Sequence, residues 1–352
     1  MSAAGIVLLA LAGAGLLALG HHAFWTRRLL APAAEDARVV ARTRDGWELA
    51  LGRRLPRGAP RRPPVLLCHG LSANRWMLDA GVEGRSLAAF LAGAGLDCFA
   101  LDLRGHGGSR RGPPGSDRWS FDTYLAEDVP AALEAVRAAT GEERVLWVGH
   151  SLGALLGMAA CQVHGGRIAG LVAMAGPVLM PPFEGAVHLL LPARGRLNRF
   201  LAAMTAPFAG ALPLRAVEGI VARDNMERPV YRRLMANGIE DVPPGVFAQL
   251  RGWVREDAFR SADGTVDYRA GLAACRQPAL FVGASQDRLA RPASARAGYQ
   301  RWGGPKELFV AGREAGLSAD YSHADLLLGR RAREEIFPRV RDWLLVHVDG
   351  PS

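Results

Sequence analysis

The sequence has a single lysine, Lys306, among its 43 basic residues, so almost all of its positive charge comes from arginine. With 34 acidic residues the formal net charge is +9. Such a charge can indicate nucleic-acid binding, because phosphate contacts dominate the affinity of proteins of that class. The arginines are scattered, however, and no basic run is interleaved with aromatic residues that could stack on bases. A codon-composition bias accounts for the arginines, and we expect no nucleic-acid partner.

Cysteine is also scarce, and the four cysteines form no C-x-x-C pair and no other metal-ligand spacing. They are Cys68, Cys98, Cys161 and Cys275. Three of them lie in apolar stretches, where a free thiol behaves as a small buried hydrophobe. The chain also lacks a G-x-G-x-x-G after a strand and a G-x-x-x-x-G-K-[ST] motif. We therefore expect no metal and no cofactor, and the cysteines do not require an oxidising compartment.

The remaining composition is that of a globular protein with ample material for a core. Hydrophobic residues make up 49% of the 352 positions and charged residues 22%, which excludes a disordered, collagen-like or coiled-coil chain. The length exceeds that of a usual single domain, although large α/β folds reach it as one unit. The chain is thus one core domain with an insertion, or two domains.

The first 26 residues carry no formal charge, and residues 3–20 are an unbroken run of small and apolar side chains. About 20 such residues suffice to cross a bilayer as a helix. A cleaved secretory signal would need a basic start and a small-residue cleavage site, and residues 20–23 are a poor site. We therefore favour an uncleaved anchor over residues 1–26, with Trp25 at the interface. The arginines that follow, beginning with Arg27 and Arg28, place the rest of the chain in the cytoplasm, with export as the alternative.

Short apolar segments alternate with helix-like stretches along the rest of the chain. The predicted strands are 65–68, 96–101, 145–148, 171–174, 279–282 and 308–310, and the clearest helices are 124–140 and 152–164. Nearly continuous apolar strands are typical of a parallel sheet that is covered on both faces, so the fold class is α/β with a doubly wound sheet. Residues 53–64, rich in Arg, Pro and Gly, are expected to form a turn or linker.

Residues 177–275 break this alternation, because they contain no clear strand and several apolar, helix-like patches such as 187–191 and 200–208. A loop of this length would be unusual. We expect an inserted helical lid between two parts of one core, residues 27–176 and 276–352.

The pattern Gly149-His150-Ser151-Leu152-Gly153 follows a predicted strand and opens a predicted helix. This is G-x-S-x-G in the strand–turn–helix context that a nucleophilic serine requires. Gly149 and Gly153 relieve crowding in the sharp turn, and the helix amino terminus favours developing negative charge. A helix N-cap is the alternative role for Ser151.

At this point the chain resembles the α/β-hydrolase superfamily over about residues 45–345. Four further motifs or residues occur in the order expected of that fold. They are His69-Gly70-Leu71 after the first buried strand, the turn 102–109 with the pattern D-x-R-G-H-G-x-S, Asp287 after a strand, and His323 after the last strand. The resemblance implies a mostly parallel sheet with a lid and the catalytic triad Ser151, Asp287 and His323. Within the superfamily, residues 321–343 are similar to the branch of lipases and polyhydroxyalkanoate synthases.

Each residue would have a defined role in this chemistry. His323 would take the proton of Ser151, and Asp287 would fix the imidazole tautomer. The backbone N–H groups of Leu71 and Leu152 would hold the oxyanion, where one donor is typically worth about 3 kcal/mol of barrier. A serine at position 151 excludes the relatives that carry Asp or Cys there, and it points to acyl-ester chemistry.

Other candidates for these roles are weaker. Asp320 and Asp325 are close to His323 in sequence, but neither directly follows a strand, and His347 lies in the terminal helix pattern. Gly176 stands where an alternative acid would be placed. Turn, cap or surface roles are the alternatives for Asp287 and His323. We expect His69, His106 and His150 to brace the loops around the site, and Ser109 to be a turn residue.

The leading hypothesis is therefore a membrane-tethered serine hydrolase of carboxylic esters, with lipid-like or other hydrophobic acyl esters favoured. An acyltransferase or thioesterase would use the same triad with another acceptor or leaving group. A non-catalytic scaffold on the same fold is the third possibility, although such proteins usually lose a triad residue.

Overall fold

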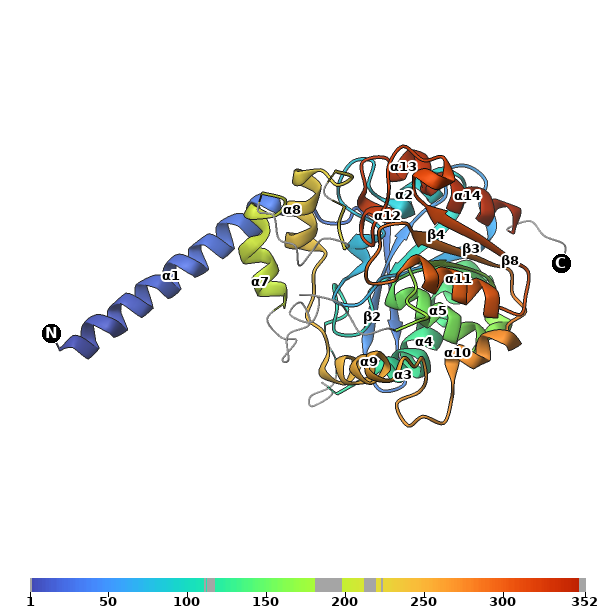
Figure 1. Cartoon of the computed structure of the whole chain (residues 1–352), viewed down its shortest axis with the longest axis horizontal. Coiled ribbons are helices and arrows are strands. Elements are labelled where there is room, and N and C mark those ends of the chain that lie inside the picture. Colours follow the sequence, from blue (N-terminus) through green and yellow to red (C-terminus); the bar gives the residue numbers. More distant parts are fainter. Residues whose placement is uncertain are drawn as a thin grey trace.

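The computed structural model describes residues 2–110, 112, 118–180, 198–211, 220–222 and 224–347. Its centre is an eight-stranded sheet in the order β1-β2-β4-β3-β5-β6-β7-β8 (Figure 1). The strands are β1 (Ala37–Arg42), β2 (Glu48–Arg54), β3 (Arg61–Cys68), β4 (Leu96–Leu101), β5 (Val145–His150), β6 (Ile168–Met174), β7 (Ala279–Ala284) and β8 (Lys306–Ala311). All neighbouring strands from β4 to β8 pair in parallel, whereas β2 runs antiparallel to β1 and β4. The predicted mostly parallel sheet is confirmed.

All six predicted strands are present, but the sequence pattern missed β1 and β2. The expected turn or linker over residues 53–64 is wrong at both ends, because Arg53 and Arg54 close β2 and Arg61 opens β3. Ion pairs explain how strands accommodate these arginines: Arg53 bonds Asp97 of β4, and Arg54 bonds Asp79 at 2.8 Å. Pairing of this kind satisfies charges that lie near the core.

Helices cover both faces of the sheet (Figure 1). They are α1 (Ala3–Leu29), α2 (Leu87–Gly93), α3 (Phe121–Thr123), α4 (Val129–Thr140), α5 (Leu152–Val163), α7 (Asn198–Thr205), α8 (Arg228–Asn237), α9 (Pro244–Glu256), α10 (Tyr268–Gly271), α11 (Pro292–Arg301), α12 (Asp325–Leu328), α13 (Ala332–Glu335) and α14 (Phe337–Val346). One turn of π-helix, Tyr124–Asp128, joins α3 to α4. Alternate strand residues face opposite layers: Leu66 and Cys68 pack with α4 and α5, while Val65 and Leu67 pack with α2 and α14.

All four cysteines are buried and unpaired, as expected of small core residues. The described part of the expected insertion contains α7, α8, α9 and α10 and no strand. The apolar patch 187–191 lies outside the described residues.

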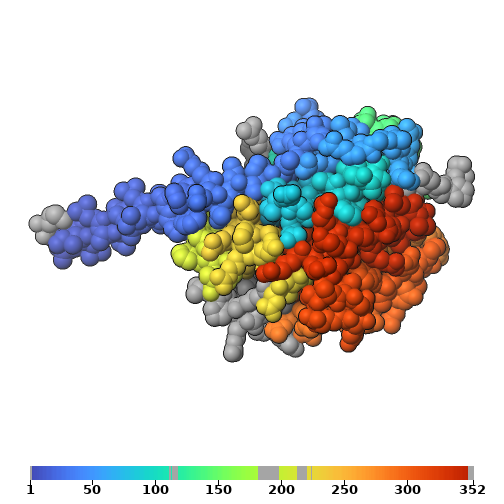
Figure 2. Space-filling view, turned by 90° about the horizontal axis from the view of Figure 1, so that it is seen from above, coloured from blue at the N-terminus to red at the C-terminus, as the bar shows by residue number. Residues whose placement is uncertain are grey.

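Helix α1 extends away from the rest of the chain (Figures 1 and 2). It contains 27 residues, and its most apolar 18-residue window has a mean hydropathy of 2.3 and no buried residue. Length and composition allow this helix to cross a membrane, although a signal sequence near an N-terminus has the same properties. Its carboxyl-terminal end contacts α7 and α8. Figure 2 shows α1 projecting from the molecule next to these two helices.

Candidate active site

Ser151 lies at the turn between β5 and α5, with φ 56° and ψ −117°. This left-handed conformation costs a non-glycine residue about 1–3 kcal/mol and persists only where the surroundings enforce it. The Ser151 N–H donates to Met174 O at 2.8 Å, which ties the turn to the end of β6. The hydroxyl makes no hydrogen bond with any described residue; in structures without substrate, catalytic hydrogen bonds are often long and tighten later.

Three glycines allow this turn to pack closely. A Cβ on Gly149 would lie 2.2 Å from Gly153 O, and a Cβ on Gly153 would lie 2.2 Å from Cys68 O at the end of β3. A Cβ on Gly70 would lie 2.9 Å from the Cβ of Ser151. The serine and the loop after β3 are therefore in direct contact because these positions carry no side chain.

His69 holds that loop in place. Its Nε2 accepts the Leu103 N–H at 3.1 Å, so Nδ1 carries the proton and donates to Gly70 O at 2.8 Å. The two N–H groups expected to bind an oxyanion, those of Leu71 and Leu152, donate to none of the described residues. Both belong to segments that meet at Ser151, so the structure leaves them available to a ligand.

The structure also brings Asp287 and His323 together. Asp287 follows β7, and its Oδ2 accepts the proton on His323 Nδ1 at 2.7 Å. Its Oδ1 accepts the N–H groups of Leu289 and Ala290 at 2.8 and 2.9 Å. Both partners are buried, with 3% of Asp287 and 6% of His323 exposed. The arrangement leaves His323 Nε2 as the nitrogen that can accept a proton.

His150 places His323 beside the serine turn. Its Nε2–H donates to His323 O at 3.0 Å, and the two rings lie 4.7 Å apart. Burial lowers the pKa of His150 to about 3, so the ring is neutral at pH 7. Its Nδ1 is buried without a hydrogen-bond partner among the described residues. His150 therefore acts through backbone contact rather than as a charge.

The neighbouring carboxylates are engaged elsewhere. Asp320 accepts the Ser285 hydroxyl at 2.9 Å and the Arg313 N–H at 3.0 Å. Asp325 accepts the Ser322 N–H and the Asn225 amide. Of the three carboxylates, Asp287 is the one that contacts the imidazole of His323 in the described part of the chain.

The turn 102–109 supports the site from the side of β4. Asp102 accepts N–H groups from Arg75 and Gly108 at 2.8 Å each, and Ser109 Oγ donates to Asp102 O while it accepts the Ala50 N–H. A Cβ on Gly107, whose φ is 48°, would meet the Asp102 carboxyl group at 2.3 Å.

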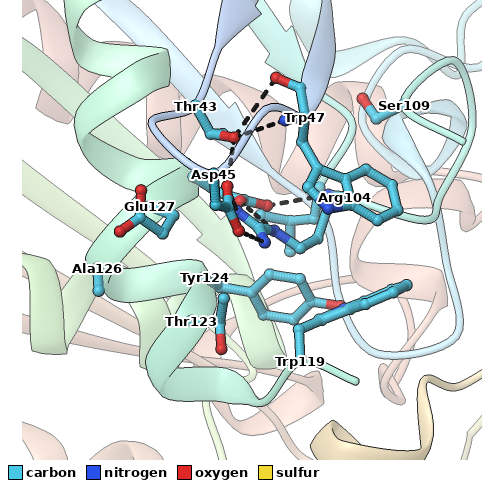
Figure 3. Close-up of polar contacts among 12 residues, drawn as sticks. Thr43, Asp45, Trp47, Arg104, Ser109, Trp119, Thr123, Tyr124, Ala126 and Glu127 are labelled. Atoms are coloured by element: carbon cyan, nitrogen blue, oxygen red, sulfur yellow. Dashed lines mark hydrogen bonds and ion pairs between the residues drawn. The ribbon is translucent and has the colours of Figure 1, made fainter. Parts of the chain in front are cut away.

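Arg104 fixes the same turn to the helical layer. Its Nε donates to Asp128 at 2.6 Å, and Asp45 binds the outer guanidinium nitrogens. Figure 3 shows Arg104 beside Asp45, with Trp47 on one side and Tyr124 on the other. His106 donates from Nδ1 to Arg104 O, and burial lowers the pKa of His106 to about 4. The turn is thus a rigid support next to His69.

Sequence reasoning missed Glu240, which links the insertion to the loops of the site. Its buried Oε1 accepts Asn74 Nδ2 at 2.8 Å, the Gly107 N–H at 3.1 Å and Arg110 Nη2 at 2.5 Å. Its own N–H donates to Ser72 O at 2.9 Å. No motif in the sequence surrounds Glu240, so its partners, about 130 residues away or more, could be found only in three dimensions.

We expect Gly153→Ala to destabilise the protein strongly and to remove serine reactivity, because the new Cβ would overlap Cys68 O. Overpacking usually costs about 1–3 kcal/mol, and contact with a fixed backbone atom places this variant at the upper end. Gly252→Ala is the matched control, since a Cβ on this helical glycine meets no atom within 4 Å. It should stabilise the protein by about 0.5–1 kcal/mol. Urea denaturation of both variants measures the difference, and equal effects would contradict the close packing of the turn.

We also expect a pH dependence of stability from His69, whose pKa burial lowers from 6.5 to about 4. Between these values the unfolded chain binds a proton that the folded chain does not. The free energy of unfolding should therefore fall as the pH is lowered, by up to about 1.4 kcal/mol per pH unit for this group. In His69→Gln this contribution disappears, so urea denaturation between about pH 6.5 and pH 5 should give a shallower slope than in the wild type. Identical slopes would show that His69 is not held neutral.

Comparison with known proteins identifies the family of this fold. The model of the family described as alpha/beta hydrolase fold matches residues 63–316. Gastric triacylglycerol lipase of Rattus norvegicus is 36% identical over 132 residues, which are 34% of this chain and 33% of the lipase. The match thus spans about a third of the length of this curated relative.

Two solved structures share the fold over most of the chain. The enol-lactonase of Burkholderia xenovorans LB400 superposes with a TM-score of 0.61 and 21% identity, over 87% of this chain and 99% of the lactonase. A membrane phospholipase A, described as a bacterial virulence factor, superposes with a TM-score of 0.60 and 18% identity, over 99% of this chain and 98% of its own. Since the family model covers well over half of the sequence and the topology agrees with it, the chain belongs to the alpha/beta hydrolase fold family.

Proposed function

We propose that this protein is a serine hydrolase that cleaves carboxylic esters through an acyl-enzyme, with Ser151, His323 and Asp287 as its triad. The observation that carries the proposal is the 2.7 Å contact between His323 Nδ1 and Asp287 Oδ2 beside a serine with left-handed backbone. Curated relatives named as lipases support ester chemistry.

In the first half of the reaction, Ser151 Oγ attacks the ester carbonyl carbon while its proton passes to His323 Nε2. Asp287 keeps the ring in the tautomer that can accept this proton and stabilises the imidazolium. The N–H groups of Leu71 and Leu152 stabilise the oxyanion. The tetrahedral intermediate then expels the alcohol, which takes the proton from His323.

In the second half, water attacks the acyl-serine. His323 accepts one proton of that water, and the second tetrahedral intermediate collapses to the free acid and Ser151, whose oxygen recovers the proton. The net reaction consumes one ester and one water and yields one acid and one alcohol. No metal or cofactor is required for these steps.

We further propose that the substrate has a hydrophobic acyl chain, that the insertion acts as a lid, and that α1 anchors the protein in a membrane. The apolar composition of α1 and the exposed side chains of α7 support the last two points. The arginines after α1 favour a cytoplasmic catalytic domain, with export as the alternative.

Labelling with a fluorophosphonate and turnover of p-nitrophenyl esters of increasing chain length test the catalytic part. Ser151→Ala should lose the label, and both Ser151→Ala and His323→Ala should lose turnover by about 10⁴-fold or more. Asp287→Asn should lose about as much, because the amide favours the wrong tautomer. Asp320→Asn is the matched control, and we expect it to retain activity within about twofold, since Asp320 contacts Ser285 and Arg313 instead.

The alternatives give different outcomes. Labelling at Ser151 without ester turnover would favour an acyltransferase or a thioesterase. Absence of labelling in the folded wild-type protein would contradict the enzyme and favour a scaffold. A maximum at long acyl chains would identify a lipase rather than a short-chain esterase.

A further inference from the structure

Helix α1 consists of two parts with different surroundings. From Ala3 to Leu17 its residues are exposed except for two partly exposed glycines. From position 18 onward, one face of the helix is partly buried. Its residues follow helical spacing and include Ala18, His21, His22, Trp25 and Leu29. A covered face with helical spacing indicates that this part of α1 docks against the rest of the protein. The exposed apolar part, residues 3–17, requires an apolar partner other than the rest of this chain.

The docked part contacts α7 and the short 3₁₀ helix that follows it, Ala206–Phe208. His21 Nε2 donates to Met204 O at 3.1 Å, and its ring stacks on Phe208 with the centroids 6.2 Å apart. The ring of His22 stacks on Phe200 at 5.0 Å. Positions 200 and 204 lie on the side of α7 that faces α1, and Phe208 lies at the edge of this side, where His21 reaches it.

The end of α1 is also fixed to α8 and to the core. Asn237 donates from Nδ2 to Leu29 O at 2.9 Å and accepts the Ala31 N–H on Oδ1 at 3.0 Å. Trp76 Nε1 donates to Ala31 O at 2.6 Å. The projecting part of α1 therefore has a defined position relative to α7.

Apolar side chains of α7 remain exposed next to this junction. Leu201 is 50% exposed and Phe208 is 55% exposed, and together with Thr205 they share an outward face at i, i+4 and i+7. Phe24, which precedes Trp25 in the docked part of α1, is 59% exposed.

The length of α1 determines at which depth of a bilayer this surface of α7 would lie. A hydrocarbon core of about 30 Å takes about 20 helical residues. If the core begins at Ala3, it ends near His22, which is the residue that stacks on Phe200. The polar side chains of His21 and His22 lie at this boundary, and the exposed Arg27 and Arg28 follow at the depth of the lipid headgroups. With α1 in a bilayer, helix α7 would lie at the membrane surface.

We propose that the outward face of α7 and its extension, formed by Leu201 and Phe208, is a second membrane contact that inserts into the surface of the lipid bilayer. The proposal rests on the membrane anchor stated under the proposed function. Asn198 at the start of α7 lies 3.5 Å from Ser72 Oγ, one residue after Leu71 of the expected oxyanion site. An ester that leaves the bilayer at α7 would therefore be close to the loop that carries Leu71, and the substrate class that fits this surface is one carried by membranes.

Fluorescence quenching in proteoliposomes tests the contact in the full-length protein. The four native cysteines are buried, so a cysteine introduced at an exposed position reacts selectively with an environment-sensitive NBD label. The positions are Phe208→Cys on α7, Leu9→Cys on α1 and Val163→Cys at the end of α5 as the matched exposed control. The vesicles contain phosphatidylcholine and phosphatidylglycerol with nitroxide-labelled lipid as the quencher.

We expect quenching at positions 9 and 208 and none at 163. Quenching at 9 without quenching at 208 would overturn the α7 contact while the anchor stands. No quenching at either position would show that α1 is not in the bilayer, which would refute the anchor and the α7 contact together. Fluorophosphonate labelling of Ser151 in the same samples reports independently on the catalytic proposal.

An activity measurement adds a functional readout. The double variant Leu201→Glu and Phe208→Glu should hydrolyse a long-chain ester embedded in vesicles about tenfold or more slowly than wild type, because it loses apolar area at the interface. Its turnover of a water-soluble p-nitrophenyl ester should stay within about twofold. Val163→Glu should retain both activities. An equal loss on soluble and embedded esters would show damage to the site and overturn the role assigned to α7.

Discussion

The close approach of Gly153 to the end of β3 is the contact on which the candidate site depends. The position where its Cβ would stand lies 2.2 Å from Cys68 O, so the first turn of α5 can lie on the strand end only with glycine there. This approach brings Ser151 against Gly70 and forces the left-handed backbone of the serine. It also brings together at Ser151 the two segments that carry Leu71 and Leu152. A methyl group added at position 153 would push the segment that carries Ser151 away from the end of β3.

The buried histidines around this contact are neutral, whereas charged groups are common in active sites. His69 can accept the Leu103 N–H only while Nε2 is unprotonated, and burial ensures this by lowering its pKa to about 4. His150 and His106 are held neutral for the same reason. A charge on any of them would oppose the imidazolium that forms on His323 during the proposed reaction. Their neutrality therefore serves the chemistry as well as the packing.

The sequence allowed the sheet and the candidate residues to be predicted because both are local patterns in a known order. Apolar runs located the six strands that pair in parallel, Asp287 comes shortly after β7, and His323 follows the last strand. Strands β1 and β2 were missed since they are partly exposed, and β2 ends in two arginines whose partners, Asp97 and Asp79, cannot be identified from spacing. Glu240 and Asn237 were missed for a related reason. Neither belongs to a motif, and each acquires its role from partners more than about 100 residues away.

Those two residues connect helix α1 to the candidate site. Asn237 binds the end of α1 through its side chain, and its carbonyl oxygen accepts Asn74 Nδ2. The same Asn74 amide donates to Glu240, whose N–H holds Ser72 next to Leu71. Every link in this series is a hydrogen bond of 2.8–3.0 Å between groups that are buried or partly buried. A displacement of α1 would therefore reach the loop that carries Leu71, one of the two proposed oxyanion donors. In a protein that takes its ester from a bilayer, this connection would make the geometry of the oxyanion site depend on how the anchor sits in the membrane.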